Sequence, residues 1–379
     1  MTDYRRRVPD ARRPADAPAR DVLPGPGDDD LGAGTQAGPD TGAPGVGEPR
    51  PAVLSTVPLP PLSESTPAWP GSEVEVDGIP LYLRHTPWTG PLDGPADDAP
   101  RERALYVHGL GGAATNWTDL AGLLAVRCEG FAIDLPGFGQ SEPPARGGWS
   151  IADHVSAVVA TLEWVRDRPG PGQGAPVHLL GNSLGGLVGL LATARRRDLV
   201  ATLTLVSPAM PVYRVPPAFD RAIALLLLPG IPTLAEKRIA LGTPEERVRG
   251  MLAMVFGDPA RVPATRFAEA VQEMRQRDGQ PWAGRALTRS MRGLMTSYLR
   301  VGRANAWRAA RSVDVPALVV WGAEDKLVDP RLAPRLALAL PDARLQLQPG
   351  IGHVAMTEAP EDTARAVLGL LEEAAGRVR

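Results

Sequence analysis

The sequence predicts an α/β protein built on a mostly parallel, twisted β-sheet with helices on both faces. Short apolar runs alternate with longer amphipathic stretches between residues 104 and 206, and this alternation resumes at residue 317. The short runs are continuously apolar, which is typical of strands that are covered on both faces. One of them leads into Gly181-Asn182-Ser183-Leu184-Gly185, a Gly-x-Ser-x-Gly pattern that indicates a sharp turn from a strand into a helix.

Composition excludes several classes of protein. The chain has 379 residues and a formal net charge of −2, which favours neither nucleic acid nor an anionic membrane surface as a partner. The single cysteine, Cys128, cannot form an internal disulfide and is expected to be a buried structural thiol. No cysteines and histidines have the sequence spacing of metal ligands, so we expect neither a metal nor another cofactor.

Residues 1–69 are expected to form a disordered tail. This segment is rich in Pro, Gly, Asp, Ala and Arg and has almost no aromatic or β-branched residues, so it cannot bury enough apolar surface to offset the entropy cost of ordering. Residues 1–20 lack the apolar stretch of a signal peptide, and no run in the chain approaches the ~18 apolar residues of a membrane span. We therefore expect a soluble, cytoplasmic protein without stable membrane insertion.

The folded core is expected to comprise residues 70–208 and 309–379. It opens with an antiparallel hairpin, because two alternating runs flank the turn signal Asp77-Gly78. The helix that begins at Ser150 has a capping box, with Asp153 three residues later. The predicted strands are 73–76, 79–84, 104–107, 131–133, 177–180, 201–206, 317–321 and 344–347, and the predicted helices of the core are 117–126, 150–167, 184–196, 330–340 and one that begins at Pro360.

The strand pattern is interrupted between residues 209 and 308. This segment has helical stretches at 219–228, 263–277 and 282–299, and Thr243-Pro244-Glu245-Glu246 is a capping box with proline at the first helical position. A helical insert between two strands of a sheet is expected to form a lid over a site. The alternative is a separate helical domain that is unrelated to any active site.

Ser183 is the candidate nucleophile. A serine in a strand-to-helix turn has strained backbone angles and close packing around it, so its neighbours must be small, as Gly181, Gly185 and Gly186 are. A serine hydroxyl is a weak nucleophile at its ordinary pKa and needs a general base that is oriented by a carboxylate. The pattern therefore requires a histidine and an acid elsewhere in the chain.

His353 is the candidate general base, because it lies in a glycine-flanked loop after the last strand. Asp325, in the turn that follows the strand 317–321, is the favoured acid, and Glu324 and Asp329 are the alternatives. The other histidines have simpler structural readings: His85 in the opening hairpin, His154 at a surface-facing helix start, His178 inside a strand, and His108 as an organiser of the glycine-rich turn that follows it.

An anionic tetrahedral intermediate would also need hydrogen-bond donors. One donor would be the backbone N–H of Leu184, which directly follows the nucleophile. The second would come from the loop His108-Gly109-Leu110, where glycine lets the backbone approach a substrate closely. A structural tight turn is the alternative interpretation of this loop.

Five motifs together resemble the α/β-hydrolase superfamily, in order and in spacing, across residues 72–379. They are His108-Gly109-Leu110-Gly111-Gly112, Asp134-Leu135-Pro136-Gly137-Phe138-Gly139-Gln140-Ser141, Gly181-Asn182-Ser183-Leu184-Gly185-Gly186, Trp321-Gly322-Ala323-Glu324-Asp325 and Gly352-His353. The resemblance implies an α/β-hydrolase fold with a helical cap. It also implies Ser183 as nucleophile, His353 as general base and acid, Asp325 as its orienter, and the N–H groups of Leu110 and Leu184 as the oxyanion hole.

The expected activity is hydrolysis of a carboxylic ester through an acyl-serine, with an apolar acyl group beneath the lid. A small molecule is the expected partner, and the residue pattern does not indicate an oligomeric state. The elbow also resembles that of C–C bond hydrolases that act on ring-cleavage products, but those enzymes commonly have tryptophan after the histidine, where this chain has Val354. A non-catalytic ligand receptor of the same fold is a further alternative.

Overall fold

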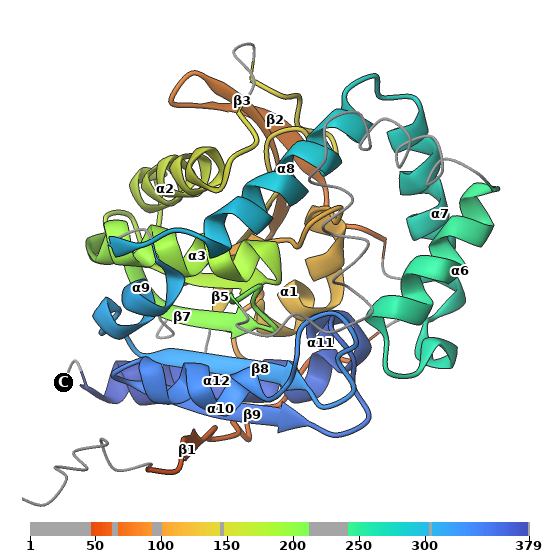
Figure 1. Ribbon diagram of the computed structural model, residues 1–379. Helices are drawn as coiled ribbons and strands as arrows, with labels where there is room; N and C mark the ends of the chain where they lie inside the picture. Colours follow the sequence, from red (N-terminus) through yellow and green to blue (C-terminus); the bar gives the residue numbers. More distant parts are fainter. Residues whose placement is uncertain are drawn as a thin grey trace, which may run out of the picture. The chain divides into compact units, whose positions relative to one another are not determined.

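The structure is a computed structural model that describes residues 47–62, 67–92, 101–144, 148–211, 242–302 and 305–377. Its strands form a nine-stranded sheet in the order β1-β9-β8-β7-β6-β4-β5-β3-β2 (Figure 1). The strands are β1 Arg50–Pro51, β2 Gly71–Val76, β3 Ile79–Thr86, β4 Glu102–Val107, β5 Cys128–Ile133, β6 Val177–Asn182, β7 Val200–Val206, β8 Ala317–Gly322 and β9 Ala343–Gln348.

The strand directions confirm the predicted mostly parallel sheet with an antiparallel start. The hairpin strands β2 and β3 are antiparallel, and β3 is also antiparallel to β5. All neighbouring pairs between β5 and β1 in the sheet order are parallel. Because parallel strands end at the same edge of a sheet, the segments that follow β4, β6 and β8 lie at one common edge.

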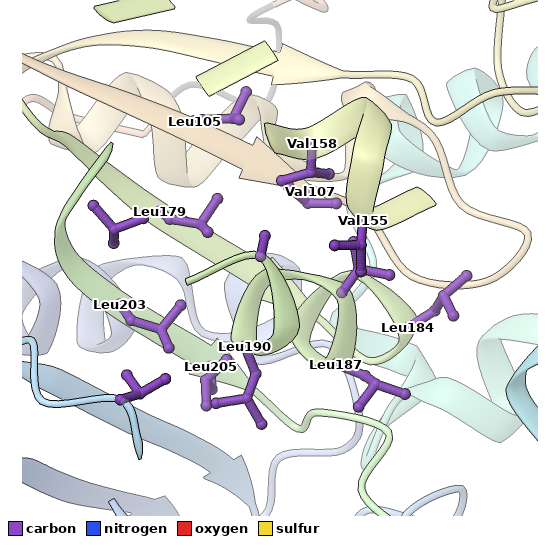
Figure 2. Close-up of a cluster of buried hydrophobic side chains, with 14 of the residues drawn as sticks. Leu105, Val107, Val155, Val158, Leu179, Leu184, Leu187, Leu190, Leu203 and Leu205 are labelled. Carbon is purple, nitrogen blue, oxygen red and sulfur yellow. The ribbon is translucent and has the colours of Figure 1, made fainter. Parts of the chain in front are cut away.

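One face of the sheet is covered by α2 (Ile151–Asp167), α3 (Leu184–Arg195), α9 (Ala306–Ser312) and α10 (Leu332–Ala339). Figure 2 shows leucine and valine side chains of β4, β6 and β7 against those of α2 and α3. Each such side chain contributes about 1.5–3 kcal/mol when it leaves water. The predicted capping box of α2 is present, with the Ser150 hydroxyl accepting from the Asp153 N–H.

The other face is covered by α1 (Thr118–Leu124), α11 (Ala355–Glu358) and α12 (Pro360–Arg377). Even-numbered residues of β4, β5 and β6 point to this face, because successive side chains of a strand alternate. Cys128 is among them and is buried, as predicted from the sequence.

Between β7 and β8, the described residues include the helices α6 (Pro244–Val255), α7 (Ala264–Asp278) and α8 (Ala283–Tyr298), which precede α9. The predicted capping box of α6 is present at Thr243 and Glu246. Helices α6 and α7 share a small apolar core of their own. The helix predicted at 219–228 lies outside the described residues. No helix in the described ranges is long and apolar enough to cross a lipid bilayer.

The prediction of a disordered tail over residues 1–69 is wrong for 47–62 and 67–69, while residues 1–46 and 63–66 lie outside the described part. The short strand β1 pairs in parallel with β9. The following residues lie on α12, where the Ser55 hydroxyl donates to Glu372 over 2.5 Å and the Ser55 N–H donates to the carbonyl of Arg365 over 2.9 Å. These partners are about 300 residues away in sequence, so the local composition carried no sign of them.

Gly369 tests this packing. A Cβ at Gly369 would lie 2.0 Å from the carbonyl oxygen of Val53, whereas a Cβ at Gly376 in the same helix would meet nothing within 4 Å. Both substitutions by alanine raise helix propensity by about 1 kcal/mol. We expect Gly369→Ala to lower the free energy of unfolding by about 1–3 kcal/mol in chemical denaturation, because residues 52–55 must move away.

The matched variant Gly376→Ala should leave stability equal or slightly raised. If Gly369→Ala is as stable as Gly376→Ala, residues 52–55 do not pack on α12 in solution.

Candidate active site

Ser183 stands at the end of β6, immediately before α3, in a strained backbone conformation (φ 53°, ψ −115°). The chain tolerates this because its glycine neighbours have no Cβ. A Cβ at Gly181 would lie 2.4 Å from the carbonyl oxygen of Gly185, and a Cβ at Gly185 would lie 2.3 Å from the carbonyl oxygen of Val107. The observed turn therefore has the geometry that the Gly-x-Ser-x-Gly pattern predicts.

His353 and Asp325 are in direct contact. The distance from His353 Nδ1 to Asp325 Oδ2 is 2.8 Å, and both side chains are buried. The other carboxylate oxygen, Oδ1, accepts from the N–H groups of Leu327 (2.8 Å) and Val328 (3.0 Å). The Asp325 carboxylate is thus held by three hydrogen-bond partners, and it can orient the imidazole so that Nε2 stays available.

The alternative acids do not take part in this contact. Glu324 is exposed, and the carboxylate of Asp329 is engaged with Arg331. Of the three carboxylates that the sequence allowed, only Asp325 has a contact with His353 among the described residues.

Asn182 connects the nucleophile turn to the histidine loop. Its Nδ2 donates to the carbonyl of His353 over 3.0 Å and to the carbonyl of Val206 over 3.1 Å. Sequence reasoning placed Asn182 beside the nucleophile but assigned it no task. Its place directly before Ser183 was the one local sign of a role. The role itself depends on the carbonyls of Val206 and His353, which lie in segments that are distant in the sequence.

Sequence reasoning also missed Glu358. Its carboxylate accepts from the N–H groups of Gly352 (2.7 Å), Gly257 (3.0 Å) and Asp258 (2.9 Å). The N–H of His353 donates to the carbonyl of Val255, at the end of α6, over 2.7 Å. The histidine loop is therefore fastened to the segment that follows α6, and no motif in the sequence signals this.

The loop after β4 lies against the nucleophile turn. A Cβ at Gly109 would lie 3.1 Å from Ser183 Cβ and 2.9 Å from Asn182 Oδ1, so glycine lets the loop approach the turn this closely without displacing either side chain. In the described part of the chain, the backbone N–H groups of Leu110 and Leu184 have no hydrogen-bond acceptor. Two free N–H groups beside a serine are what an oxyanion hole requires.

His108 holds this loop in place, as its position in the sequence suggested. Its Nε2 accepts from the N–H of Leu135 over 3.0 Å, and its Nδ1 donates to the carbonyl of Gly109 over 2.7 Å. Complete burial lowers the pKa of His108 to about 4, so the ring is neutral and its tautomer is fixed. His154 is also buried, contrary to the expected surface-facing position, with Nε2 3.0 Å from the Ser290 hydroxyl.

Helix α7 is attached to the same region by polar contacts. Arg277 donates to the carbonyl of Gly111, Thr115 donates to Glu273, and the Arg266 Nε donates to Asp119 over 3.0 Å. Burial lowers the pKa of Arg277 and raises that of Glu273. A small pocket lies here, lined by residues of the loop after β4, the loop after β5, α7 and α8: Gly111, Gly137, Phe138, Arg277, Gln280, Ala283 and Leu287.

A larger surface cleft lies elsewhere, between the β2–β3 turn and the end of α2, and contains none of the candidate catalytic residues. Among the described residues, no group of three potential metal ligands includes Ser183, Asp325 or His353. The turn of Ser183 is linked through the Asn182 amide to the loop of the buried His353–Asp325 pair and adjoins free backbone N–H groups, a set of groups that suits acyl transfer.

Comparison with known proteins agrees with this arrangement. Residues 104–366 match the model of a family described as "Alpha/beta hydrolase family". The match extends from β4 into α12 and contains the nucleophile turn, the helices between β7 and β8, and the histidine loop.

Two curated relatives are named for ester-cleaving enzymes. Lipase 3 of Moraxella sp. (strain TA144) is 27% identical over 274 residues, covering 71% of this chain and 76% of that protein. Pimeloyl-[acyl-carrier protein] methyl ester esterase of Neisseria meningitidis serogroup A is 26% identical over 291 residues, covering 73% of this chain and 80% of that protein.

A solved structure of similar fold is the 2-hydroxy-6-oxo-6-phenylhexa-2,4-dienoate hydrolase from Rhodococcus sp. strain RHA1. It has a TM-score of 0.60 and 20% sequence identity, and the likeness covers 80% of this chain and 98% of that chain. At this identity the likeness concerns the fold alone.

The buried, neutral His108 predicts a pH dependence of stability. In the unfolded chain this histidine binds a proton below its ordinary pKa of about 6.5, whereas in the folded protein it does so only below about 4. Between these values the unfolded state binds more protons, so this group makes the free energy of unfolding rise with pH. His108→Gln should remove on the order of 3 kcal/mol of that rise, as measured by urea denaturation across this pH range.

Burial also lowers the pKa of His154 to about 4. In the His108→Gln variant, His154 therefore still makes the free energy of unfolding rise with pH over this range. Burial raises the pKa of Asp134 to about 6, so this group makes the free energy of unfolding fall with pH in the same window, by less than His108 makes it rise. An unchanged slope in His108→Gln would mean that His108 is not buried as a neutral ring.

Proposed function

Since this chain belongs to the alpha/beta hydrolase family, we propose that it is a serine hydrolase that cleaves carboxylic esters of apolar small molecules through an acyl-serine intermediate. The observation that carries the proposal is the 2.8 Å contact between His353 and Asp325, joined to the turn of Ser183 by the Asn182 amide. The names of the ester-cleaving relatives support the same reaction class.

In the proposed mechanism, the Ser183 hydroxyl attacks the ester carbonyl carbon and gives its proton to His353 Nε2. Asp325 accepts the Nδ1–H of His353 and stabilises the imidazolium that forms. The tetrahedral intermediate collapses when its C–O bond to the alcohol breaks, and His353 gives the proton to the departing alkoxide. A water molecule, activated by the same imidazole, then hydrolyses the acyl-serine and restores the hydroxyl.

The negative charge of each tetrahedral intermediate would be held by the backbone N–H groups of Leu110 and Leu184. Both are fixed before the reaction, Leu184 by the first turn of α3 and Leu110 by the loop that His108 and Arg277 hold. Donors that need no reorganisation are the most effective, and loss of one costs about 10²–10³ in kcat.

We also propose that the insert between β7 and β8, residues 209–308, is a lid over this site, with the core at 70–208 and 309–379; the pairing of β1 and the contacts of Ser55 add residues 47–62 to this core. The small pocket beside the loop that follows β4 is lined by Arg277 of α7, by Leu287 of α8 and by Phe138. The lining is mixed, since Arg277 and Gln280 lie beside Phe138 and Leu287, and its apolar part supports an apolar acyl or alcohol group. The contacts of α7 with Gly111, Thr115 and Asp119 support a wall that stays attached to the core rather than a free flap.

Covalent labelling with a fluorophosphonate tests the role of Ser183. Wild-type protein should be labelled once and should release nitrophenol from short-chain esters. Ser183→Ala should lose the label and at least about 10³-fold of the activity, because the attacking oxygen is gone. Ser207→Ala is the matched control, since Ser207 is also a buried serine with positive φ (43°) at a strand end. A label that survives in Ser183→Ala would reject the proposal.

The role of Asp325 can be separated from that of its neighbours. Asp325→Asn keeps the shape but no longer stabilises the imidazolium, so we expect kcat/KM to fall by about 10³–10⁴. Glu324→Gln, an exposed carboxylate one residue away, should change kcat/KM by less than about twofold. Equal losses in the two variants would count against Asp325 as the orienting acid.

The same protein preparation distinguishes the alternatives. Decay of the absorbance of a vinylogous dienoate, without ester turnover, would identify a C–C bond hydrolase instead; the Gly-Asn-Ser turn and the fold of the Rhodococcus enzyme are compatible with that activity. Tight ligand binding with no turnover on either substrate class would identify a receptor.

A further inference from the structure

A second cluster of reactive side chains lies at the opposite edge of the sheet. Glu102 and Cys128 are the first residues of β4 and β5, and His178 is the second residue of the neighbouring strand β6. In the register, Glu102 pairs with Cys128, and His178 pairs with Ala104, which points to the same face as Glu102. All three side chains therefore extend from the same face of the sheet at nearly the same level.

One potential ligand atom from each residue lies within 4.8 Å of the other two. The His178 Nε2 and the Glu102 Oε2 are 3.4 Å apart. Cys128 and His178 are buried, and the Glu102 side chain is 25% exposed. A carboxylate oxygen, a thiol and an imidazole nitrogen thus converge at a point that solvent reaches along Glu102.

Hydrogen bonds from neighbouring residues hold the side chains of His178 and Glu102 in fixed orientations. His178 Nδ1 lies 2.9 Å from the hydroxyl of Thr202, which fixes the ring so that Nε2 faces Glu102. Metal-bound histidines are oriented in this way by a partner on the second ring nitrogen. Arg127 donates to both oxygens of Glu102, over 2.6 and 3.1 Å, as partners of ligating carboxylates do.

We propose that Glu102, Cys128 and His178 bind a divalent cation of the zinc class, with its fourth position open to solvent. Thiolate, imidazole and carboxylate are the three donor types that Zn²⁺ accepts in tetrahedral sites. Binding replaces the thiol proton of Cys128, which is released to water. Ions that require only oxygen ligands, such as Mg²⁺ and Ca²⁺, do not match this set.

Local charge is compatible with a cation in spite of Arg127. The negative charge of Glu372, on α12, also acts on the Arg127 guanidinium and helps to raise its pKa. With the thiolate formed, the three anionic groups and Arg127 leave two negative charges, which a divalent ion neutralises. Arg127 then acts as a hydrogen-bond donor to a ligating carboxylate and not as the sole counterion.

The site is separate from the proposed catalytic centre. His178 and Ser183 are at opposite ends of β6, roughly 16 Å apart at the rise of a β-strand. A bound ion would therefore join the starts of β4, β5 and β6 and stabilise the sheet without touching substrate. This inference is independent of the reaction assigned to Ser183.

Titration of metal-free, full-length protein with Co²⁺ alone tests the site, because a Co²⁺–thiolate bond gives a charge-transfer absorption band. We expect one equivalent of Co²⁺ to produce this band in the wild-type protein and one equivalent of Zn²⁺ to abolish it. Cys128→Ser should lack the band entirely. His178→Gln should bind Zn²⁺ at least about tenfold more weakly, and Thr202→Val about tenfold more weakly through loss of ring orientation.

His85→Gln is the matched control. His85 Nε2 lies 2.8 Å from a carboxylate oxygen of Glu129, so this pair resembles His178 and Glu102. Glu129 follows Cys128 in β5 and points to the opposite face of the sheet, away from the thiol. The variant should leave the Co²⁺ band and the Zn²⁺ affinity unchanged. Far-ultraviolet circular dichroism establishes that each variant is folded, and Zn²⁺ should raise the melting temperature of the wild type but not of Cys128→Ser.

No charge-transfer band in the wild-type protein would overturn the proposal. So would a Zn²⁺ affinity that is the same in wild type, Cys128→Ser and His178→Gln. None of these measurements uses hydrolysis, so a failure here leaves the assignment of Ser183 untouched, and an inactive protein leaves this test intact.

Discussion

The close approach of α3 to the ends of β4 and β6 is the constraint on which the site depends. It requires a backbone without Cβ at Gly181 and Gly185, where any side chain would lie within 2.4 Å of a carbonyl oxygen. That contact forces Ser183 into positive φ and directs the start of α3, with its free N–H groups, toward the loop after β4. The strain costs on the order of 1–3 kcal/mol, which the buried leucines of α3 and β6 offset.

Features with a local signal were predictable from the sequence. The apolar strands, the capping boxes and the Gly-x-Ser-x-Gly turn each depend on residues within a few positions of one another, and the observed sheet and family match confirm the fold class. The packing of residues 47–62 was not predictable, because its apolar and polar partners on β9 and α12 are distant in the chain. The roles of Asn182 and Glu358 were not predictable for the same reason: each side chain binds backbone groups of distant segments, and the sequence does not show which backbone groups a side chain will meet.

Buried polar groups around the site are held by partners of fixed geometry. His108 bridges two loops as a neutral ring, Asp134 accepts from the N–H groups of Ala114 and Gln140, and Glu358 binds three N–H groups. A buried polar group without a hydrogen-bond partner lowers the stability of the fold, whereas a fully paired one holds its neighbours in a fixed arrangement. The loops at the carboxyl ends of the strands are therefore ordered by hydrogen bonds, in a region where apolar packing alone would leave them free to move.

A parallel sheet brings distant residues together at both of its edges, and this explains why sequence spacing is a poor guide to such clusters. At the carboxyl edge, Ser183, Asp325 and His353 come from segments that follow three different strands. At the amino edge, Glu102, Cys128 and His178 lie at the starts of the neighbouring strands β4, β5 and β6, although 76 residues separate the first from the last. Spacing along the chain does not reveal such a cluster, because the relevant distance is the ~4.8 Å between neighbouring strands and not the length of the helices that connect them.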